Sequence, residues 1–288
     1  MAPMSDRGDS VLRAITNDGA FRVVVAKTTR TVRGVLGAQH ASRATARPFG
    51  DLITGSVLFR ETMAPNLRVQ SVLKGVGGRG SLVADSHPSG MTRGLIQLAE
   101  GEQSVDTDAG ALLQLMRTLP GGRINQGVVE MPPGGDVSRA LMAYMQTSEQ
   151  VVSMIAVGTL LGEDDITAAG GYLVQLLPEV GRGPLMIMTE RLREFEDIAP
   201  QLADAAFSPS WLLDQLLYGM EYTRLDETAI GFDCWCDELR LLSVLATLDR
   251  AEVEDLISSG ETLEITCDYC KKEYRIAPAK LRGLLGAS

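Results

Sequence analysis

Residues 234–270 read CWCDELRLLSVLATLDRAEVEDLISSGETLEITCDYC and contain all four cysteines of this 288-residue chain. Cys234 and Cys236 form a C-x-C pair. After 30 intervening residues, Cys267 and Cys270 form a C-x-x-C pair. Cysteines gathered in two close pairs within one short window are typical of a site rather than of four independent core positions. The window therefore predicts a small module built around four sulfur atoms.

The sequence around the second pair predicts a hairpin. Residues 263–266 and 273–276 alternate apolar and polar side chains, so the C-x-x-C pair lies at the tip between two short strands. Two thiolates that converge from one tight turn are the setting of a zinc knuckle. Between the pairs, residues 237–248 read as a helix. Asp249 with Glu252 predicts a capping-box start for a second helix that ends at Gly260.

These short elements have little apolar core of their own. Four thiolates around one Zn(2+) ion at about 2.3 Å would supply the missing stability, on the order of 10 kcal/mol at neutral pH. We therefore expect zinc as the cofactor, and its predicted ligands are Cys234, Cys236, Cys267 and Cys270. Iron in the same thiolate cage stays open as an alternative, as does a purely structural zinc site without a redox role.

The same ligands could form a redox switch. Two-electron oxidation within each pair would make Cys234–Cys236 and Cys267–Cys270 disulfides and remove the ligands, so the module should then unfold. The disulfide of a C-x-C pair closes a small, strained ring, and strained bridges are the labile kind. A thioredoxin-type catalytic pair is disfavoured, because that motif needs a helix after its first cysteine and here a strand follows.

Composition narrows the class of protein. The chain is 45% hydrophobic and 22% charged, as globular proteins are. Its net charge of −10 argues against nucleic acid and against anionic membrane surfaces as partners. The N-terminal residues lack the apolar stretch of a signal peptide, and no run approaches the about 18 apolar residues of a membrane span. We expect a cytoplasmic, reducing location, which disfavours structural disulfides.

Charge also divides the chain into parts. Residues 1–175 contain 16 basic and 16 acidic side chains, residues 176–231 contain 4 and 10, and residues 232–288 contain 7 and 11. We predict a neutral main domain (1–178), an acidic helical linker (179–232) and a zinc-binding redox-switch domain (233–288). All of the excess acid belongs to the last two parts.

Local patterns in the main domain predict an α+β fold with a mainly antiparallel sheet and inserted helices. Asn17-Asp18-Gly19 is a turn signal, and Asp136 reads as a helix N-cap. The expected strands cover residues 21–26, 67–73, 81–85, 124–130, 151–157 and 171–177, and the expected helices cover residues 30–41, 50–61 and 137–145.

The linker carries two amphipathic patterns. Leu192, Phe195 and Ile198 recur every three residues beside acidic side chains, which indicates a helix. Ser208-Pro209 then predicts the start of a second helix, whose apolar stripe must bury itself against the main domain. We predict that this stripe takes part in binding clients, with Trp211, Leu212, Leu216 and Met220 as its candidate residues.

Other signals point to ordinary structure. Residues 75–80 fit G-x-G-x-x-G, but a strand rather than a helix follows, so a hairpin turn is expected. His40 lies in a helix-like stretch and His87 in a turn-like stretch, so neither is expected to be a catalytic base, and Glu163-Asp164-Asp165 reads as a solvated loop. Nothing assembles into an enzyme active site, so we expect no enzymatic activity.

The C-x-C and C-x-x-C spacing resembles the 33 kDa heat-shock chaperonin family, the redox-regulated holdases of the bacterial cytoplasm. The resemblance extends over most of the chain and includes the order of main domain, linker and cysteine module. It is carried by residues 21–32 (FRVVVAKTTRTV), 125–129 (NQGVV), 144–150 (YMQTSEQ) and 168–178 (AAGGYLVQLLP).

The resemblance implies an ATP-independent chaperone that is inactive when reduced and zinc-bound. Oxidation would release zinc, unfold the C-terminal module and loosen the linker, and the exposed apolar surface would hold unfolding or oxidatively damaged proteins. Family members are homodimers once activated. The alternative is a constitutive zinc-stabilised interaction module whose metal never leaves.

This sequence departs from the family pattern around the thiols. Asp237 replaces a small or polar residue after the C-x-C pair, and Lys271 replaces a common glycine after the C-x-x-C pair. Bulky Trp235 lies between the first two cysteines. Nearby carboxylates are expected to raise the pKa of the thiols in the absence of zinc. These differences bear on the threshold of oxidation, not on the ligand set.

Overall fold

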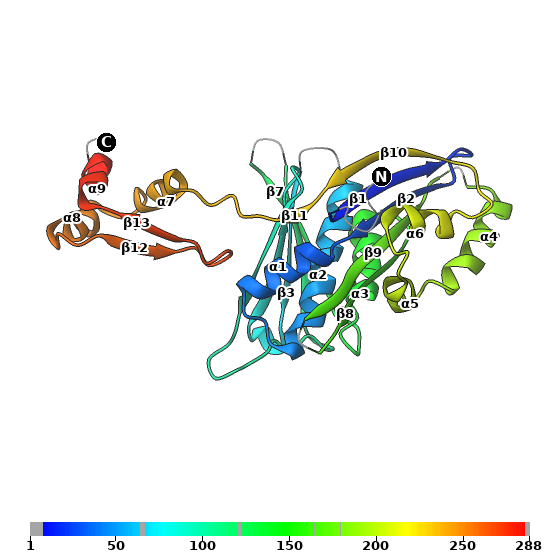
Figure 1. The fold of residues 1–288 in the computed structure, drawn as a ribbon, viewed down its shortest axis with the longest axis horizontal. Coiled ribbons are helices and arrows are strands. Elements are labelled where there is room, and N and C mark those ends of the chain that lie inside the picture. Colours follow the sequence, from blue (N-terminus) through cyan, green and yellow to red (C-terminus); the bar gives the residue numbers. More distant parts are fainter. Residues whose placement is uncertain (1–7, 64–66, 120–121, 164, 179, 286–288) are drawn as a thin grey trace. The chain divides into compact units, whose positions relative to one another are not determined.

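The computed structural model describes residues 8–63, 67–119, 122–163, 165–178 and 180–285. The chain forms two compact units, Met1–Phe232 and Asp233–Ser288 (Figure 1). The first unit contains both the predicted main domain and the predicted linker, and the boundary between these two at residue 178 stays a prediction.

A five-stranded antiparallel sheet in the first unit has the strand order β10-β1-β2-β9-β8. Its strands are β1 (Ser10–Thr16), β2 (Phe21–Lys27), β8 (Ser153–Leu161), β9 (Ile166–Leu176) and β10 (Tyr222–Ala229). The predicted turn at residues 17–19 joins β1 to β2, with Gly19 in the left-handed region at a φ of 71°. Strand β10 belongs to the predicted linker, so the linker supplies one edge of the sheet.

A second sheet has six strands in the order β11-β5-β4-β3-β6-β7. Its strands are β3 (Arg68–Lys74), β4 (Ser81–Ser86), β5 (Met91–Gln97), β6 (Leu112–Thr118), β7 (Ile124–Glu130) and β11 (Gly231–Phe232). Only β11 pairs in parallel, with β5, and the other neighbours are antiparallel. The glycine-rich residues 75–80 form the turn between β3 and β4, with a short 3-10 segment η2 (Val76–Gly78). The α+β prediction is confirmed.

The long helix α2 (Arg43–Thr62) packs against strands of both sheets. It is buried on almost every side, and Phe49, Leu52 and Ile53 have no exposed surface. Helices α1 (Thr29–Ala38) and α3 (Val137–Tyr144) pack beside it, and α3 continues into a wide turn, η3 (Met145–Glu149). Together these elements form the first core cluster, which joins the two sheets through α2.

Three linker helices contribute to a second core cluster with the five-stranded sheet. They are α4 (Arg182–Arg193), α5 (Ala199–Ala203) and α6 (Pro209–Leu216). This cluster includes Leu12, Val23 and Tyr172 from the sheet. Leu202 and Leu213 come from the helices. The linker is thus an integral part of the fold of the first unit.

The second unit contains α7 (Glu238–Leu245), α8 (Arg250–Ser258), β12 (Leu263–Thr266), β13 (Glu273–Ile276) and α9 (Pro278–Leu285). The predicted hairpin is confirmed, because β12 pairs antiparallel with β13. The predicted capping box is also present, with the Asp249 and Glu252 side chains each accepting from the other residue's backbone N–H.

Several local predictions are wrong. Helix α2 starts at Arg43 and runs through Pro48, not from residue 50. Phe195 and Ile198 lie between α4 and α5, so their spacing reflects burial in the second core cluster rather than a helix. Strands β1, β5, β6, β10 and β11 were not predicted. Within the described residues, every helix is too short or too polar to cross a bilayer.

Candidate metal centre

The structure brings the four cysteines of the second unit together. Their sulfur atoms all lie within 4.8 Å of one another, and all four residues are half-buried. The Sγ atoms of Cys234 and Cys267 are 3.9 Å apart, and those of Cys236 and Cys270 are 3.4 Å apart. Four sulfurs about 2.3 Å from one ion would lie about 3.8 Å from each other. The cluster therefore has the dimensions of a tetrahedral metal site.

Strands β12 and β13 hold the C-x-x-C pair at the tip of their hairpin. The Lys271 N–H donates to the Cys267 carbonyl (2.8 Å), and the Cys267 N–H donates to the Lys272 carbonyl (2.9 Å). Lys271 has a φ of 59°, in the left-handed region that favours glycine. The backbone geometry thus gives a physical reason for glycine at this position, and Lys271 occupies it at some cost.

The C-x-C pair lies in extended chain directly before α7. The Cys234 N–H donates to the Asp233 carboxylate (2.8 Å). The Asp237 carboxylate accepts from the Arg240 N–H (2.7 Å) and caps α7. The residue that departs from the family pattern after Cys236 therefore fixes where the helix begins.

Tyr274 is a member of the site that the sequence interpretation missed. Its hydroxyl lies 3.1 Å from the Sγ atom of Cys236 and 2.9 Å from the Cys236 carbonyl oxygen, and it donates to this residue. Tyr274 comes from β13, so it connects the C-x-C segment to the hairpin. Its place in an alternating strand was visible in the sequence, but nothing there indicated a contact across 38 residues.

Burial and the contacts within the cluster give Cys236 and Cys270 different pKa values. Burial acts to raise the pKa of Cys236, but hydrogen bonds from Tyr274 and from the other cysteines outweigh it and lower the value to about 7. Burial, with a contribution from neighbouring thiols, raises the pKa of Cys270 to about 12. The prediction that carboxylates raise the thiol pKa is therefore wrong for Cys236. Four thiolates this close need a cation among them, because like charges disfavour one another.

The donor set fits a soft or borderline metal ion. Thiolate sulfur favours zinc or iron over magnesium and calcium, which prefer oxygen. Among the described residues, these cysteines are the one group of three or more His, Cys, Asp or Glu side chains whose ligand atoms could share a metal ion. The sequence prediction that they converge agrees with the structure, and the identity of the metal stays a prediction.

The module has little else to hold it together. Its buried apolar side chains among the described residues are Val253, Tyr274, Ile276 and Leu281. Helix α7 has no buried residue, and Leu239 and Val244 on it are 76% and 65% exposed. A core this small contributes only a few contacts, so the sulfur cluster is the main candidate for stabilising the unit.

The predicted client-binding residues lie in and next to α6. Leu212 and Leu216 have no exposed surface, and Trp211 and Met220 pack at the margin of the second core cluster. The Ser208 hydroxyl accepts from the Trp211 N–H (3.2 Å), as expected for an N-cap. In this state the stripe covers the sheet and offers little surface to a client, so its role in binding stays a prediction.

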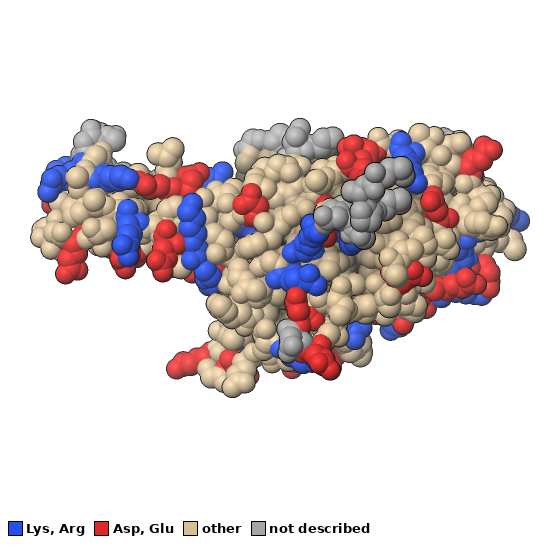
Figure 2. Space-filling model, viewed as in Figure 1, with Lys and Arg blue, Asp and Glu red and all other residues tan. Residues whose placement is uncertain are grey.

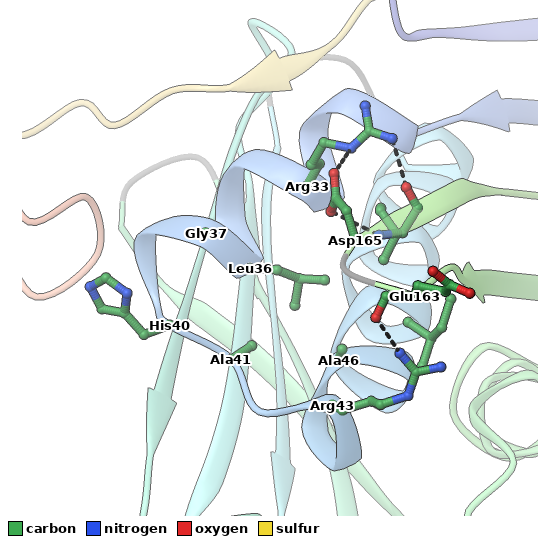
Figure 3. A pocket seen from close by; sticks show the side chains of 11 residues that line it. Arg33, Leu36, Gly37, His40, Ala41, Arg43, Ala46, Glu163 and Asp165 are labelled. Carbon is green, nitrogen blue, oxygen red and sulfur yellow. Dashed lines mark hydrogen bonds and ion pairs between the residues drawn. The ribbon is translucent and has the colours of Figure 1, made fainter.

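The remaining polar candidates have structural partners. Asp165 forms an ion pair with Arg33 (2.5 Å), and Arg43 donates to the Glu163 carbonyl (3.1 Å), at a cavity of about 500 Å³ (Figure 3). His40 lines the same cavity, with its ring directed away from the Arg33–Asp165 pair (Figure 3). Asp164 lies outside the described residues. His87 lies in the turn after β4 and contacts the Ser89 hydroxyl (2.7 Å).

Basic and acidic side chains are mixed on the visible surface of the protein (Figure 2). On the face shown in Figure 2, Lys and Arg alternate with Asp and Glu, and they form no continuous basic area. Ion pairs such as Arg250–Glu254 and Arg275–Glu264 account for part of this mixing on the module.

The sequence matches a family model described as Hsp33 protein over residues 9–277. The chain is 29% identical over 287 residues to the 33 kDa chaperonin of Syntrophotalea carbinolica, covering 96% of this chain and 99% of that protein. It is 27% identical to the 33 kDa chaperonin of Thermus thermophilus, covering 96% and 86%.

A solved structure has the same fold. The crystal structure of the 33 kDa chaperonin, a heat shock protein 33 homologue, from Thermotoga maritima matches with a TM-score of 0.79. The match covers 97% of this chain and 98% of that chain at 22% identity. Sequence and fold comparisons therefore agree over nearly the whole chain.

Proposed function

The chain belongs to the Hsp33 family, and from this premise we propose that it is a redox-regulated, ATP-independent holdase that binds unfolding proteins under oxidative stress. The observation that carries the proposal is the cluster of four cysteine sulfurs within 4.8 Å in a unit that has almost no other core. Oxidation of such a cluster removes the main source of stability of that unit.

In the resting state, Cys234, Cys236, Cys267 and Cys270 would hold a zinc ion. When bound, zinc supplies charge compensation for four thiolates and cross-links the C-x-C segment to the hairpin. Tyr274 supports this arrangement by donating to Cys236, and Asp237 holds the segment at the start of α7. The resting chain is inactive as a holdase, because the linker helices cover the apolar face of the five-stranded sheet.

Oxidation would convert each cysteine pair to a disulfide. Each pair of thiolates loses two electrons and gains one S–S bond, while one molecule of hydrogen peroxide takes up these electrons together with two protons from solvent and becomes two molecules of water, and the metal would leave with its ligands gone. We assign the bonds Cys234–Cys236 and Cys267–Cys270, because one and two intervening residues keep these partners close even in unfolded chain. In the folded cluster, Cys234 also lies 3.9 Å from Cys267 and Cys236 lies 3.4 Å from Cys270, which are contacts from one pair to the other, so mapping of the disulfides is a direct test.

Loss of the module would then affect the linker. The module begins directly after Phe232, which ends β11 at the end of the linker. If α4 to α6 detach, the sheet face that contains Leu12, Val23 and Tyr172 becomes accessible, together with the stripe at Leu212 and Leu216. Newly exposed apolar surface binds exposed apolar segments of other proteins.

The same surface supports the other parts of the proposal. Two copies with exposed apolar faces would bury them against each other, so we propose a homodimer in the oxidised state. The partners are unfolded or oxidatively damaged proteins. The resting state requires reduced cysteines, so we propose that the protein works in the cytoplasm.

Peroxide titration of the zinc-loaded protein tests the function. A chromogenic chelator reports metal release, peptide mapping by mass spectrometry reports the disulfides, and light scattering of a heat-denatured client reports holding. We expect one zinc per chain to be released as both disulfides form, and client aggregation to be suppressed only afterwards. Metal that stays bound, or equal suppression before and after oxidation, would support the constitutive zinc-stabilised interaction module instead.

A further inference from the structure

Strand β10 covers the edge of the five-stranded sheet. It pairs antiparallel with β1, from Ser10 opposite Ala229 to Thr16 opposite Tyr222 (Figure 1). The register shifts between Arg13 and Ala14, where Leu225 is the extra residue on β10. Without β10, the main-chain N–H and C=O groups of β1 would form a free edge that can pair with another extended chain.

The attachment of β10 includes little apolar burial, because Tyr222 at its start is the one side chain of this strand that packs against the second core cluster. None of its eight side chains is buried, and Leu225 is 54% exposed. Beyond the main-chain ladder, β10 is held by polar contacts at the surface, namely Arg13–Asp226 (2.6 Å), Ser10–Glu227 (2.8 Å) and Asn17–Thr223 (2.9 Å). Exposed pairs of this kind add little stability, so β10 depends on its neighbours to stay in place.

Strand β1 is different, because it is anchored independently of β10. Val11, Leu12 and Ala14 are buried, and β1 pairs with β2 along its other edge. Val11 belongs to the first core cluster, whereas Leu12 and Ala14 belong to the second. Release of β10 would therefore leave a preformed, rigid edge rather than a disordered segment.

Two connections couple β10 to the parts that oxidation is proposed to disturb. At its start, Tyr222 bonds to Asp214 on α6, and Arg224 donates to Ser210 (3.2 Å). After its end, β11 carries Phe232, which packs directly on Gly34 of α1, where an added Cβ would lie 2.8 Å from the phenyl ring. The module begins one residue later. Detachment of α6 or of Phe232 would remove the support on one side of β10.

We propose that the edge of β1 exposed by release of β10 is a client-binding site, and that it takes an extended segment of unfolded polypeptide as an added strand. This inference rests on the proposed function and deepens it. The segment would be about seven residues long, as β10 is along this ladder, with main-chain hydrogen bonds supplying affinity. Recognition of the backbone suits a holdase, because every unfolded protein offers it.

The sheet also sets a preference among segments. Side chains alternate between the two faces of a strand, and Leu12 and Ala14 lie on the face that the linker helices would leave. A client strand beside β1 would place every second side chain over that face. We therefore infer a preference for segments with apolar residues at alternate positions.

A proline in β1 tests the edge directly. The Asp9 carbonyl accepts from the Ile230 N–H, and the Asn17 N–H donates to the Glu221 carbonyl, so odd-numbered residues of this strand direct their backbone groups toward β10. Ile15→Pro removes one such N–H. Val128→Pro on β7, the edge strand of the other sheet with a 51% exposed valine, is the matched control.

We expect oxidised Ile15→Pro to need about fivefold more protein for the same suppression of client aggregation, the effect of one lost hydrogen bond. Val128→Pro should hold clients like the wild type. Zinc release on oxidation should be unchanged in both. Equal holding by both variants would overturn the inference while leaving the proposed function intact, whereas failure of the wild type to hold clients would count against the proposed function itself.

A photo-crosslinker keeps the test decisive if the proline variant does not fold. Benzoylphenylalanine at Ser10, on the linker-facing side of β1, should cross-link to client only after oxidation. The same group at Val128 should not. Absence of client cross-links from position 10 after oxidation, or equal cross-linking to client at both positions, would contradict a client strand on β1.

Discussion

The two units of this protein are stabilised in different ways. The first unit buries apolar side chains from two sheets and six helices in two core clusters. The second unit buries four apolar side chains among its described residues and gathers four thiols around a common centre. An oxidant does not act directly on buried apolar side chains such as leucine and valine, whereas it converts thiolate ligands to disulfides. The comparison explains how one chain can contain both a permanent scaffold and a part that an oxidant unfolds.

Loss of one cysteine ligand should produce the largest difference in stability between the two units. Cys267→Ser should abolish tight zinc binding and unfold the module, because metal binding there supplies on the order of 10 kcal/mol. The core of the first unit around α2 and β1 should keep its fold, whereas α6 and β10 should lose protection. Metal analysis and amide exchange of each unit measure both effects, with Thr266→Ser as the control. A variant that still binds one zinc with a folded module would show that the sulfur cluster is not the source of stability.

The same truncation in each core should have different consequences. Leu52→Ala and Leu281→Ala each remove a side chain with no exposed surface and should each cost about 2–5 kcal/mol. In the module this is a large part of the non-metal stability, so Leu281→Ala should accelerate zinc loss to a chelator. Leu52→Ala should lower the melting temperature of the first unit without affecting zinc. Equal zinc loss in both variants would mean that the stability of the first unit also controls zinc binding by the module.

The hydroxyl group of Tyr274 should account for the contribution of this residue to zinc affinity. Tyr274→Phe removes the donor to Cys236 and should weaken zinc binding about tenfold, as loss of an outer-shell partner does. Competition with a chelator of known affinity measures the change. Tyr218→Phe, at a 75% exposed side chain of the first unit, should have no effect. Unchanged affinity in Tyr274→Phe would reduce the role of this residue to packing.

Lys271 should show the smallest effect. Because its φ is 59°, Lys271→Gly should stabilise the zinc-bound hairpin by about 1 kcal/mol and raise the peroxide concentration needed for release. Lys271→Ala removes the charge but keeps the strain, so it should not reproduce the gain. If alanine stabilises as much as glycine, charge and not backbone strain is responsible.

The parts of the structure that short-range signals determine were predictable. The C-x-x-C hairpin, the Asp249–Glu252 capping box and the Asp136 cap all depend on residues a few positions apart. Convergence of the two cysteine pairs was predictable as well, because two close pairs within one short window are typical of a metal site.

Features that depend on distant partners were missed. Strand β10 has no buried side chain and therefore no alternating pattern, and its partner β1 lies more than 200 residues away. The contact from Tyr274 to Cys236 has no local signal either. Phe195 and Ile198 show the opposite error, in which a helix was predicted where none forms. Their three-residue spacing arises because both side chains are buried in the turn between α4 and α5.

Amide hydrogen exchange of the zinc-loaded and peroxide-oxidised protein shows whether the four thiolates hold the module folded. We expect that oxidation removes protection throughout residues 233–285 and lowers it in α6 and β10, while α2 and β1 stay protected. Module peptides that remain protected after both disulfides have formed, or loss of protection that begins in α2, would contradict a switch whose stability comes from the four thiolates.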